Sequence, residues 1–206
     1  MTRVILTRHG ETRWNLEGLV QGAMDSPLTE KGIRQAQVLA NRLQDEGISV
    51  IYSSDLPRAI ATADEIRKRL NLPEVFISAA MRELSFGDWE GRAWKDLRGA
   101  YPDLFKLWEE SPHQVQIPGG ESILQVTERA WSFFSSLPSK YPEQTICIVT
   151  HGMTLQLLVK KALGIAIDDW TNVPWQYNTA INILDLTTEG EVIPILIADH
   201  QHLDLE

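Results

Sequence analysis

The chain has 206 residues, of which 43% are hydrophobic, and its 19 basic and 28 acidic side chains give a net charge of −9. This length is enough for one domain over residues 1–206 with a core that needs no disulfide or structural metal. The acidic balance disfavours nucleic-acid binding, and the longest apolar runs, such as Ile193–Ala198, are far shorter than the ~20 residues that cross a membrane.

The first part of the chain alternates predicted strands with predicted helices. Arg3–Thr7 is a run of mostly β-branched and apolar residues that predicts a buried strand, and Thr29 is a suitable N-cap for a helix that follows. A second strand is predicted over Ile48–Ser53, a helix over Asp55–Leu70 and a short strand over Glu74–Ile77. The apolar stripe of the first helix comprises Ile33, Ala36, Ala40 and Leu43. This alternation predicts an α/β fold with a mostly parallel sheet.

Residues 80–120 interrupt the alternation because they are rich in Trp, Pro and Gly. We interpret them as a loop-rich excursion with short helices near Trp94–Gly99 and Asp103–Glu110, and we expect it to cap a site. Trp89, Trp94 and Trp108 of this segment either line a pocket for an apolar alcohol or form a small satellite core.

The last part of the chain returns to strands and helices. We predict a helix over Ser122–Leu137, a strand over Thr145–Thr150 and a helix over Met153–Leu163. Ala180–Leu186 and Glu191–Ala198 flank a turn-forming segment and predict an antiparallel hairpin. The expected fold is therefore a three-layer α/β/α domain with a mostly parallel sheet plus a C-terminal antiparallel hairpin.

Two predicted strands end in a similar way, at Arg8-His9-Gly10 and at His151-Gly152. Because α/β sheets bind ligands at the carboxyl ends of their strands, both histidines are candidates for one site. Arg58 lies in the first turn of the helix after a third strand, where the helix N-terminus also favours an anion.

These residue types suit phosphoryl transfer. A neutral imidazole is a competent nucleophile, and guanidinium groups match the oxygens of a phosphate. A second histidine, if protonated, supplies a further donor and a charge. The leaving alkoxide needs a proton, and Glu83 is our candidate for the acid.

Other readings of the reactive residues are weaker. Cys147 lacks the arginine six residues later that a cysteine phosphatase needs, since Met153 occupies that position, so we predict a buried core thiol. His200 and His202 form a His-x-His pair that either binds a metal or belongs to a mobile polar tail, and we favour the tail. Trp170 and Trp175 either form a dimer contact or pack in the core.

Six blocks of sequence, in this order, resemble the histidine phosphatase superfamily, also called phosphoglycerate mutase-like. They are Thr7–Thr12 with Trp14-Asn15, Asp25–Gly32, Ser53–Ala59, Arg82–Gly91, Pro118–Ser122 and Val149–Gly152. The resemblance covers residues 3–180 and implies a three-layer α/β/α fold.

The resemblance also implies roles for individual residues. His9 would be the phosphorylated nucleophile, Arg8, Arg58 and His151 would bind the phosphate with it, and Glu83 would donate the proton. Further positions that match substrate- or phosphate-binding residues are Asn15, Gln21, Glu121, Ser122 and Asn178. The family needs no metal and no other cofactor.

Within the family, the short chain and Glu11-Thr12 resemble the small phosphatases more than the mutases. The implied function is hydrolysis of a phosphomonoester of a small metabolite, of the broad-specificity, alpha-ribazole phosphate, or sugar or glycerate phosphate type. A phosphoglycerate mutase and a non-catalytic phospholigand-binding member are the alternatives. A single cysteine and no evident signal peptide predict a cytoplasmic protein, and a homodimer is a further expectation.

Overall fold

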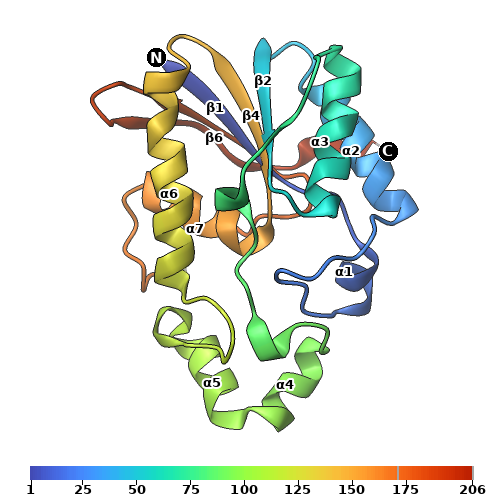
Figure 1. The fold of residues 1–206 in the computed structure, drawn as a ribbon, viewed down its shortest axis with the longest axis vertical. Helices are drawn as coiled ribbons and strands as arrows, with labels where there is room; N and C mark the ends of the chain where they lie inside the picture. Colours follow the sequence, from blue (N-terminus) through green and yellow to red (C-terminus); the bar gives the residue numbers. More distant parts are fainter. Residues whose placement is uncertain (171, 206) are drawn as a thin grey trace.

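The computed structural model describes residues 1–170 and 172–205, and it places a six-stranded sheet between helices (Figure 1). The strands are β1 (Thr2–Arg8), β2 (Ile48–Ser53), β3 (Phe76–Ile77), β4 (Thr145–Thr150), β5 (Ile181–Leu186) and β6 (Val192–Asp199). They follow the order β3-β2-β4-β1-β5-β6. The first four are parallel, whereas β5 runs antiparallel to both of its neighbours. The predicted mostly parallel sheet with a C-terminal antiparallel pair is confirmed.

The helices lie close to their predicted positions, with one addition. They are α1 (Arg13–Glu17), α2 (Glu30–Arg42), α3 (Pro57–Leu70), α4 (Trp94–Ala100), α5 (Pro102–Glu110), α6 (Ile123–Lys140) and α7 (Gly152–Ala162). The short α1 was not predicted, although Thr12 and Asn15 form a capping box at its start. None of the helices in the described residues is long and apolar enough to span a membrane.

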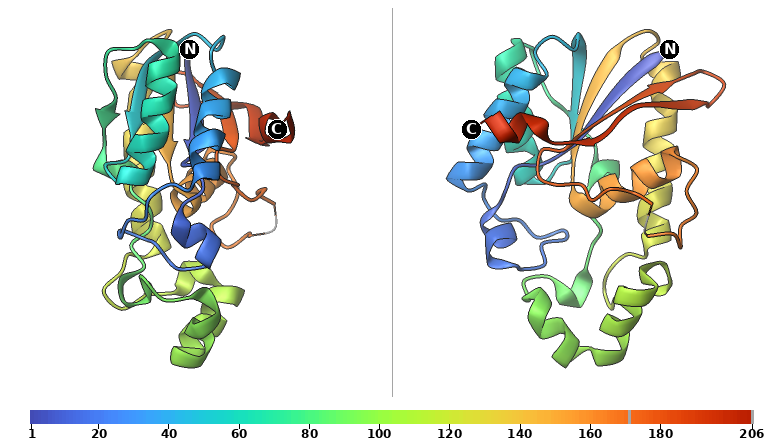
Figure 2. Two further views of the ribbon diagram at one scale, coloured as in Figure 1. Left: turned by 90° about the vertical axis from the view of Figure 1, so that its right-hand side faces the viewer. Right: turned by 180° about the vertical axis from the view of Figure 1, so that it is seen from behind.

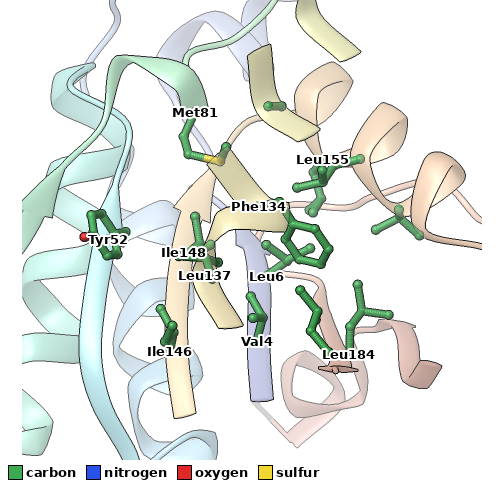
Figure 3. Packing of buried hydrophobic residues seen from close by; sticks show 14 of the residues in the cluster. Val4, Leu6, Tyr52, Met81, Phe134, Leu137, Ile146, Ile148, Leu155 and Leu184 are labelled. Atoms are coloured by element: carbon green, nitrogen blue, oxygen red, sulfur yellow. The ribbon is translucent and has the colours of Figure 1, made fainter. Parts of the chain in front are cut away.

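Alternate residues of the central strand β1 face two different cores. Val4 and Leu6 pack on one side against Phe134 of α6 and Leu155 of α7 (Figure 3). Ile5 packs on the other side with residues of α2 and α3. Because both faces are covered, the central strand is apolar throughout its middle, and this arrangement produces the three layers (Figure 2).

Two helix N-caps that the sequence predicted are present. The Thr29 side chain accepts from the Gly32 amide, and Ser122 forms a capping box with Gln125. One residue of the predicted apolar stripe was wrong: Ile33 is exposed, while its helix packs through Ala36, Leu39 and Ala40 instead. The first turn of α2 is buried at Gly32 instead, on the side that faces the Glu11 backbone.

The excursion of residues 80–120 builds a third cluster of its own. Trp89 is fully buried in it, and its ring lies 5.7 Å from that of Trp108 and 6.4 Å from that of Trp94. Trp89 is thus a satellite-core residue, as one of the two readings held. Figure 1 shows α4 and α5 of this segment far from the sheet, on the same side as α1.

The C-terminal residues do not form the expected mobile polar tail. Gln201–Leu205 form a 3-10 helix, and His202 is buried with its Nε2 atom 3.2 Å from the Thr179 hydroxyl. The prediction of a mobile tail was wrong because this short helix packs against α2, a contact that its polar sequence does not reveal.

Candidate active site

The register of β1 against β4 brings the two predicted histidines together. Arg8 pairs with Thr150 at the carboxyl ends of these parallel strands, and the His9 amide donates to the Thr150 carbonyl at 3.0 Å. His9 and His151, the next residues on each strand, therefore lie side by side with ring centroids 5.2 Å apart. Both side chains are buried.

The imidazole of His9 is held in one tautomer. Its Nδ1 atom lies 2.7 Å from the Gly10 carbonyl oxygen, which can only accept, so Nδ1 carries the hydrogen and Nε2 keeps a lone pair. Burial, together with the nearby Arg58 and Arg8, lowers the pKa of His9 well below its ordinary value of 6.5. The His9 imidazole is thus unprotonated at neutral pH.

The backbone around Gly10 leaves no freedom for this carbonyl to move. The Gly10 amide donates to the Thr62 hydroxyl at 3.0 Å. A Cβ atom at Gly10 would collide with the backbone carbonyl of Gly32, so a glycine is required where the two loops touch.

His151 differs from the sequence-based picture in its charge. Burial, then Arg58, His9 and Arg8, hold its pKa well below 6.5, so its imidazole is neutral at pH 7 and supplies one N–H donor rather than a positive charge. Neither ring nitrogen has a hydrogen-bond partner among the described residues.

The two arginines are fixed by backbone carbonyls. Arg8 Nη1 donates to the Gln176 carbonyl at 2.9 Å, and burial lowers its pKa to about 10, which leaves it cationic at neutral pH. Arg58 is 1% exposed, with Nη1 on the Met24 carbonyl at 2.6 Å and Nη2 on the Gly22 carbonyl at 2.7 Å. Arg58 is therefore part of the site rather than a surface helix charge.

Glu83 is held by the N-terminus of α7. Its carboxylate accepts from the amides of Met153 and Thr154, both at 3.1 Å, and from the Leu84 amide at 2.9 Å. The N-terminal end of a helix favours a carboxylate. These hydrogen bonds therefore hold Glu83, a residue of the excursion, next to the end of β4.

The N-terminus of α3 does not offer its donors to a ligand as predicted. The Arg58 amide donates to Asp25 Oδ1 at 3.3 Å, and the Arg58 side chain contacts the same oxygen at 3.1 Å. A carboxylate of the protein occupies the position that we had expected for a bound anion.

Four buried nitrogen atoms of the site have no partner among the described residues: Arg8 Nε, Arg58 Nε, and both ring nitrogens of His151. With His151 neutral, three of the four are donors; unpaired buried donors are rare and costly in folded proteins, so this group indicates a place built for an acceptor-rich ligand. A phosphoryl group, with several anionic oxygens, matches guanidinium and imidazole donors of this kind. The described residues contain no group of three His, Cys, Asp or Glu side chains placed to hold a metal ion.

Arg8, Arg58 and Glu83 line a cavity of about 510 Å³, and its lining residues from α4 and α5 lie away from the sheet (Figure 1). Its lining near the strand ends includes Arg8, His9, Asn15, Gln21, Gly22, Arg58, Glu83 and Gly152. The other lining residues are Leu19, Phe86, Trp94, Trp108, Glu109, Glu110, Pro112, Met153, Trp170 and Trp175. A small alcohol esterified to the phosphate would extend from the first group to the second.

His151 is buried beside His9 but is not among the lining residues, and three further predicted binding residues are absent from the lining as well. Glu121 accepts from the Ser85 amide and pairs with Arg129, and Ser122 caps α6. Asn178 donates to the carbonyl of His9 at 2.9 Å and so supports the nucleophile from behind. Direct binding by these three residues stays a prediction.

Sequence reasoning missed several contributors to the site. The carbonyls of Gly22, Met24 and Gln176 orient the guanidinium groups, but a backbone carbonyl leaves no signature in a sequence. Trp170 and Trp175 were interpreted as dimer or core residues, yet both line the cavity. Cys147 is buried in β4, as predicted, and burial raises its pKa to about 12.

The chain matches known proteins along almost its whole length. The profile of the histidine phosphatase superfamily (branch 1) matches residues 4–197. Phosphoserine phosphatase 1 of Hydrogenobacter thermophilus is 33% identical, over 94% of this chain and 90% of that protein. A probable phosphoglycerate mutase of Cronobacter sakazakii is 38% identical, over 80% of this chain and 76% of that protein. The solved structure of Bacillus stearothermophilus YhfR superposes with a TM-score of 0.93 at 33% identity, covering 98% of this chain and 100% of that one.

The chain belongs to the histidine phosphatase superfamily. Within it, the protein is a phosphoric monoester hydrolase.

Proposed function

We propose that the protein hydrolyses phosphomonoesters through a phosphohistidine formed on His9. The observation that supports this most strongly is the hydrogen bond from His9 Nδ1 to the Gly10 carbonyl, because it leaves Nε2 as the nucleophilic atom of a neutral imidazole. The unpaired nitrogens of Arg8, Arg58 and His151 lie in the same buried site.

In the first step, Nε2 of His9 attacks phosphorus and the bond from phosphorus to the alcohol oxygen breaks. The guanidinium groups of Arg8 and Arg58 neutralise the phosphoryl oxygens and His151 donates a hydrogen bond to them; the arginines are already oriented before substrate binds, which lowers the cost of reorganisation. In the second step, water attacks phosphorus, the bond to Nε2 breaks, and inorganic phosphate leaves.

Glu83 is the group we assign to proton transfer. It lines the cavity and its carboxylate is fixed by the amides at the start of α7. In its protonated form it would give a proton to the leaving alkoxide, and as a carboxylate it would then take a proton from the attacking water.

The phosphoglycerate mutase remains the alternative reaction, and a non-catalytic binding role is a more distant one. A mutase returns the phosphoryl group to a second hydroxyl, whereas a phosphatase releases inorganic phosphate. Release of phosphate against phosphate exchange between phosphoglycerates therefore separates them. We also propose that the protein acts on free small molecules rather than nucleic acid, since its net charge is −9.

The nucleophile is tested by replacing His9 with alanine and by trapping the intermediate. We expect H9A to lose phosphate release from an aryl phosphate by at least ~10⁴-fold, since removing a catalytic nucleophile has effects of this order. Wild-type protein quenched after brief mixing with labelled substrate should carry acid-labile, alkali-stable label. Substantial turnover by folded H9A, checked by circular dichroism, would exclude His9 as the nucleophile.

A further inference from the structure

The end of the active-site cavity away from the histidines has an unusual chemical character. It is formed by aromatic and apolar side chains together with the carboxylates of Glu109 and Glu110, at the C-terminal end of α5. Among the described lining residues, the cations are Arg8 and Arg58, and both belong to the phosphate end. The alcohol part of a substrate therefore meets ring faces and negative charge.

Trp94 of α4 and Trp108 of α5 line the cavity together with these carboxylates. Their rings are stacked, with centroids 6.3 Å apart and an angle of 28° between the planes, and both are half-buried. Each also contacts Phe86 edge-on at 5.5 Å, which fixes the pair in place. Indole faces carry negative electrostatic potential and attract cations, above all alkylammonium groups.

Two positive groups pair with these same carboxylates from exposed positions outside the cavity lining, and two others lie over Trp170 and Trp175. Arg98 pairs with Glu109 at 2.6 Å from an exposed position outside the cavity lining, and Lys106 lies 3.9 Å from Glu110. Lys160 covers Trp170 at 4.2 Å while its Nζ donates to the Ile167 carbonyl, and Arg8 lies 5.9 Å from the Trp175 ring. Trp170 and Trp175 thus already face protein cations, whereas no cation–π contact involves Trp94 or Trp108 in the described residues.

We infer that the leaving alcohol of the preferred substrate carries a cationic ammonium group on a small apolar skeleton and no carboxylate. The inference rests on the proposed phosphatase function and names its substrate class. Trp94 and Trp108 receive the ammonium group, and Glu109 and Glu110 supply the opposite charge. A carboxylate on the alcohol would meet these two glutamates, and the cations beside them, Arg98 and Lys106, do not line the cavity, so we expect phosphoglycerate-type esters to be poor substrates.

The test compares three esters of one shape that differ in charge. These are phosphocholine, neohexyl phosphate, in which carbon replaces the nitrogen, and the neohexyl ester with one methyl replaced by a carboxylate. We expect kcat/KM for phosphocholine to exceed that for neohexyl phosphate by about 5-fold or more, and the carboxylate ester to be at least ~10-fold below neohexyl phosphate. Equal values for the cationic and neutral esters, or a preference for the carboxylate, would overturn the inference.

Two variants locate the preference. E109Q/E110Q should reduce the phosphocholine-to-neohexyl ratio about 3-fold or more, because it removes both carboxylates and keeps the shape. The control D96N/D103N removes two exposed acidic groups of α4 and α5 outside the cavity lining and should leave the ratio unchanged. W108L should also lower the ratio, whereas W108F should largely restore it. A ratio that is unchanged in E109Q/E110Q and W108L would contradict the assignment.

An aryl phosphate serves as the reference substrate. If the wild type hydrolyses it and H9A does not, but the three esters show no charge preference, only the substrate class is wrong. If the wild type does not hydrolyse it at all, the proposed function itself fails.

Discussion

At the scale of single residues, this site depends on groups whose charge is set by what surrounds them. His9 and His151 are buried beside two guanidinium groups, which keeps both imidazoles neutral. In the proposed mechanism, neutrality makes His9 nucleophilic, and the positive charge that a phosphate needs comes from Arg8 and Arg58. The division of labour removes the need for a separate base to activate the nucleophile.

Glu83 gives a prediction at this scale. In E83Q the amide keeps the shape of the carboxylic acid but cannot donate an acidic proton. We expect alkyl phosphates, whose alkoxides leave poorly, to lose ~10²–10⁴-fold in kcat, while p-nitrophenyl phosphate, whose leaving group needs no proton, loses far less in the phosphorylation step. Single-turnover measurements with both substrates separate this step from hydrolysis of the intermediate. Equal losses in phosphorylation would remove Glu83 from the role of leaving-group acid.

At the scale of elements, the strand–helix junctions determine where the chemistry occurs. The register of β1 with β4 brings His9 beside His151, and the N-terminus of α7 then holds Glu83 through two amides. Arg129 of α6 donates to the carbonyls of Ala80, Arg82 and Glu83, which ties the start of the excursion to the α/β domain. Arg129 therefore anchors the excursion at Glu83, the residue that we propose as the acid.

The capping box at the start of α6 gives a prediction about stability. S122A removes a hydroxyl that accepts from the Gln125 amide, and we expect a loss of about 1 kcal/mol in the free energy of unfolding. S135A, an exposed serine in the same helix, is the matched control and should change stability by less than ~0.5 kcal/mol. Urea unfolding followed by circular dichroism gives both values; an S122A loss no larger than that of S135A would mean that the capping box contributes little.

At the scale of the whole molecule, an acidic protein encloses a cationic pocket that binds an anion. The net charge of −9 opposes phosphate binding from a distance, so the affinity must come from the buried donors of the site. Burying these groups costs free energy of folding, and for the two histidines this cost depends on pH.

Both histidines have pKa values below 6.5 in the folded protein, so the unfolded chain binds more protons below that pH. Their contribution to stability is therefore present above pH 6.5 and is lost as the pH falls, by about 1.4 kcal/mol per pH unit for each histidine while the folded state keeps it neutral. H9N and H151N should each show a shallower fall between pH 6.5 and 5 than the wild type. Parallel curves for all three proteins would show that the imidazoles are not held neutral.

Independence from metal ions is a prediction about the whole catalytic system. Because Arg8 and Arg58 supply positive charge to the phosphoryl oxygens in the proposed mechanism, that mechanism needs no divalent cation. We expect kcat/KM for an aryl phosphate to change less than ~2-fold after dialysis against EDTA. Loss of activity that Mg²⁺ or Zn²⁺ restores would contradict this mechanism.

The sequence by itself determined the fold class, most helix and strand positions, and the residues proposed for the central site. Strand and helix periodicity are local properties, and His9, Arg58 and His151 follow predictable strand ends, whereas Glu83 lies in the excursion and its role was implied by the family resemblance. The same local reasoning failed where burial depends on distant partners, as at Ile33 and His202.

Only the tertiary structure decided the charge state of His151, the carbonyls that orient the arginines, and the composition of the far end of the cavity. The same cavity is lined by four tryptophans that lie up to 81 positions apart in the sequence: Trp94, Trp108, Trp170 and Trp175. These four side chains come together only because the excursion and the segment before β5 pack around one cavity. Long-range packing of this kind leaves no periodic signal in a single sequence, so the shape and charge of the substrate pocket could not be predicted from it.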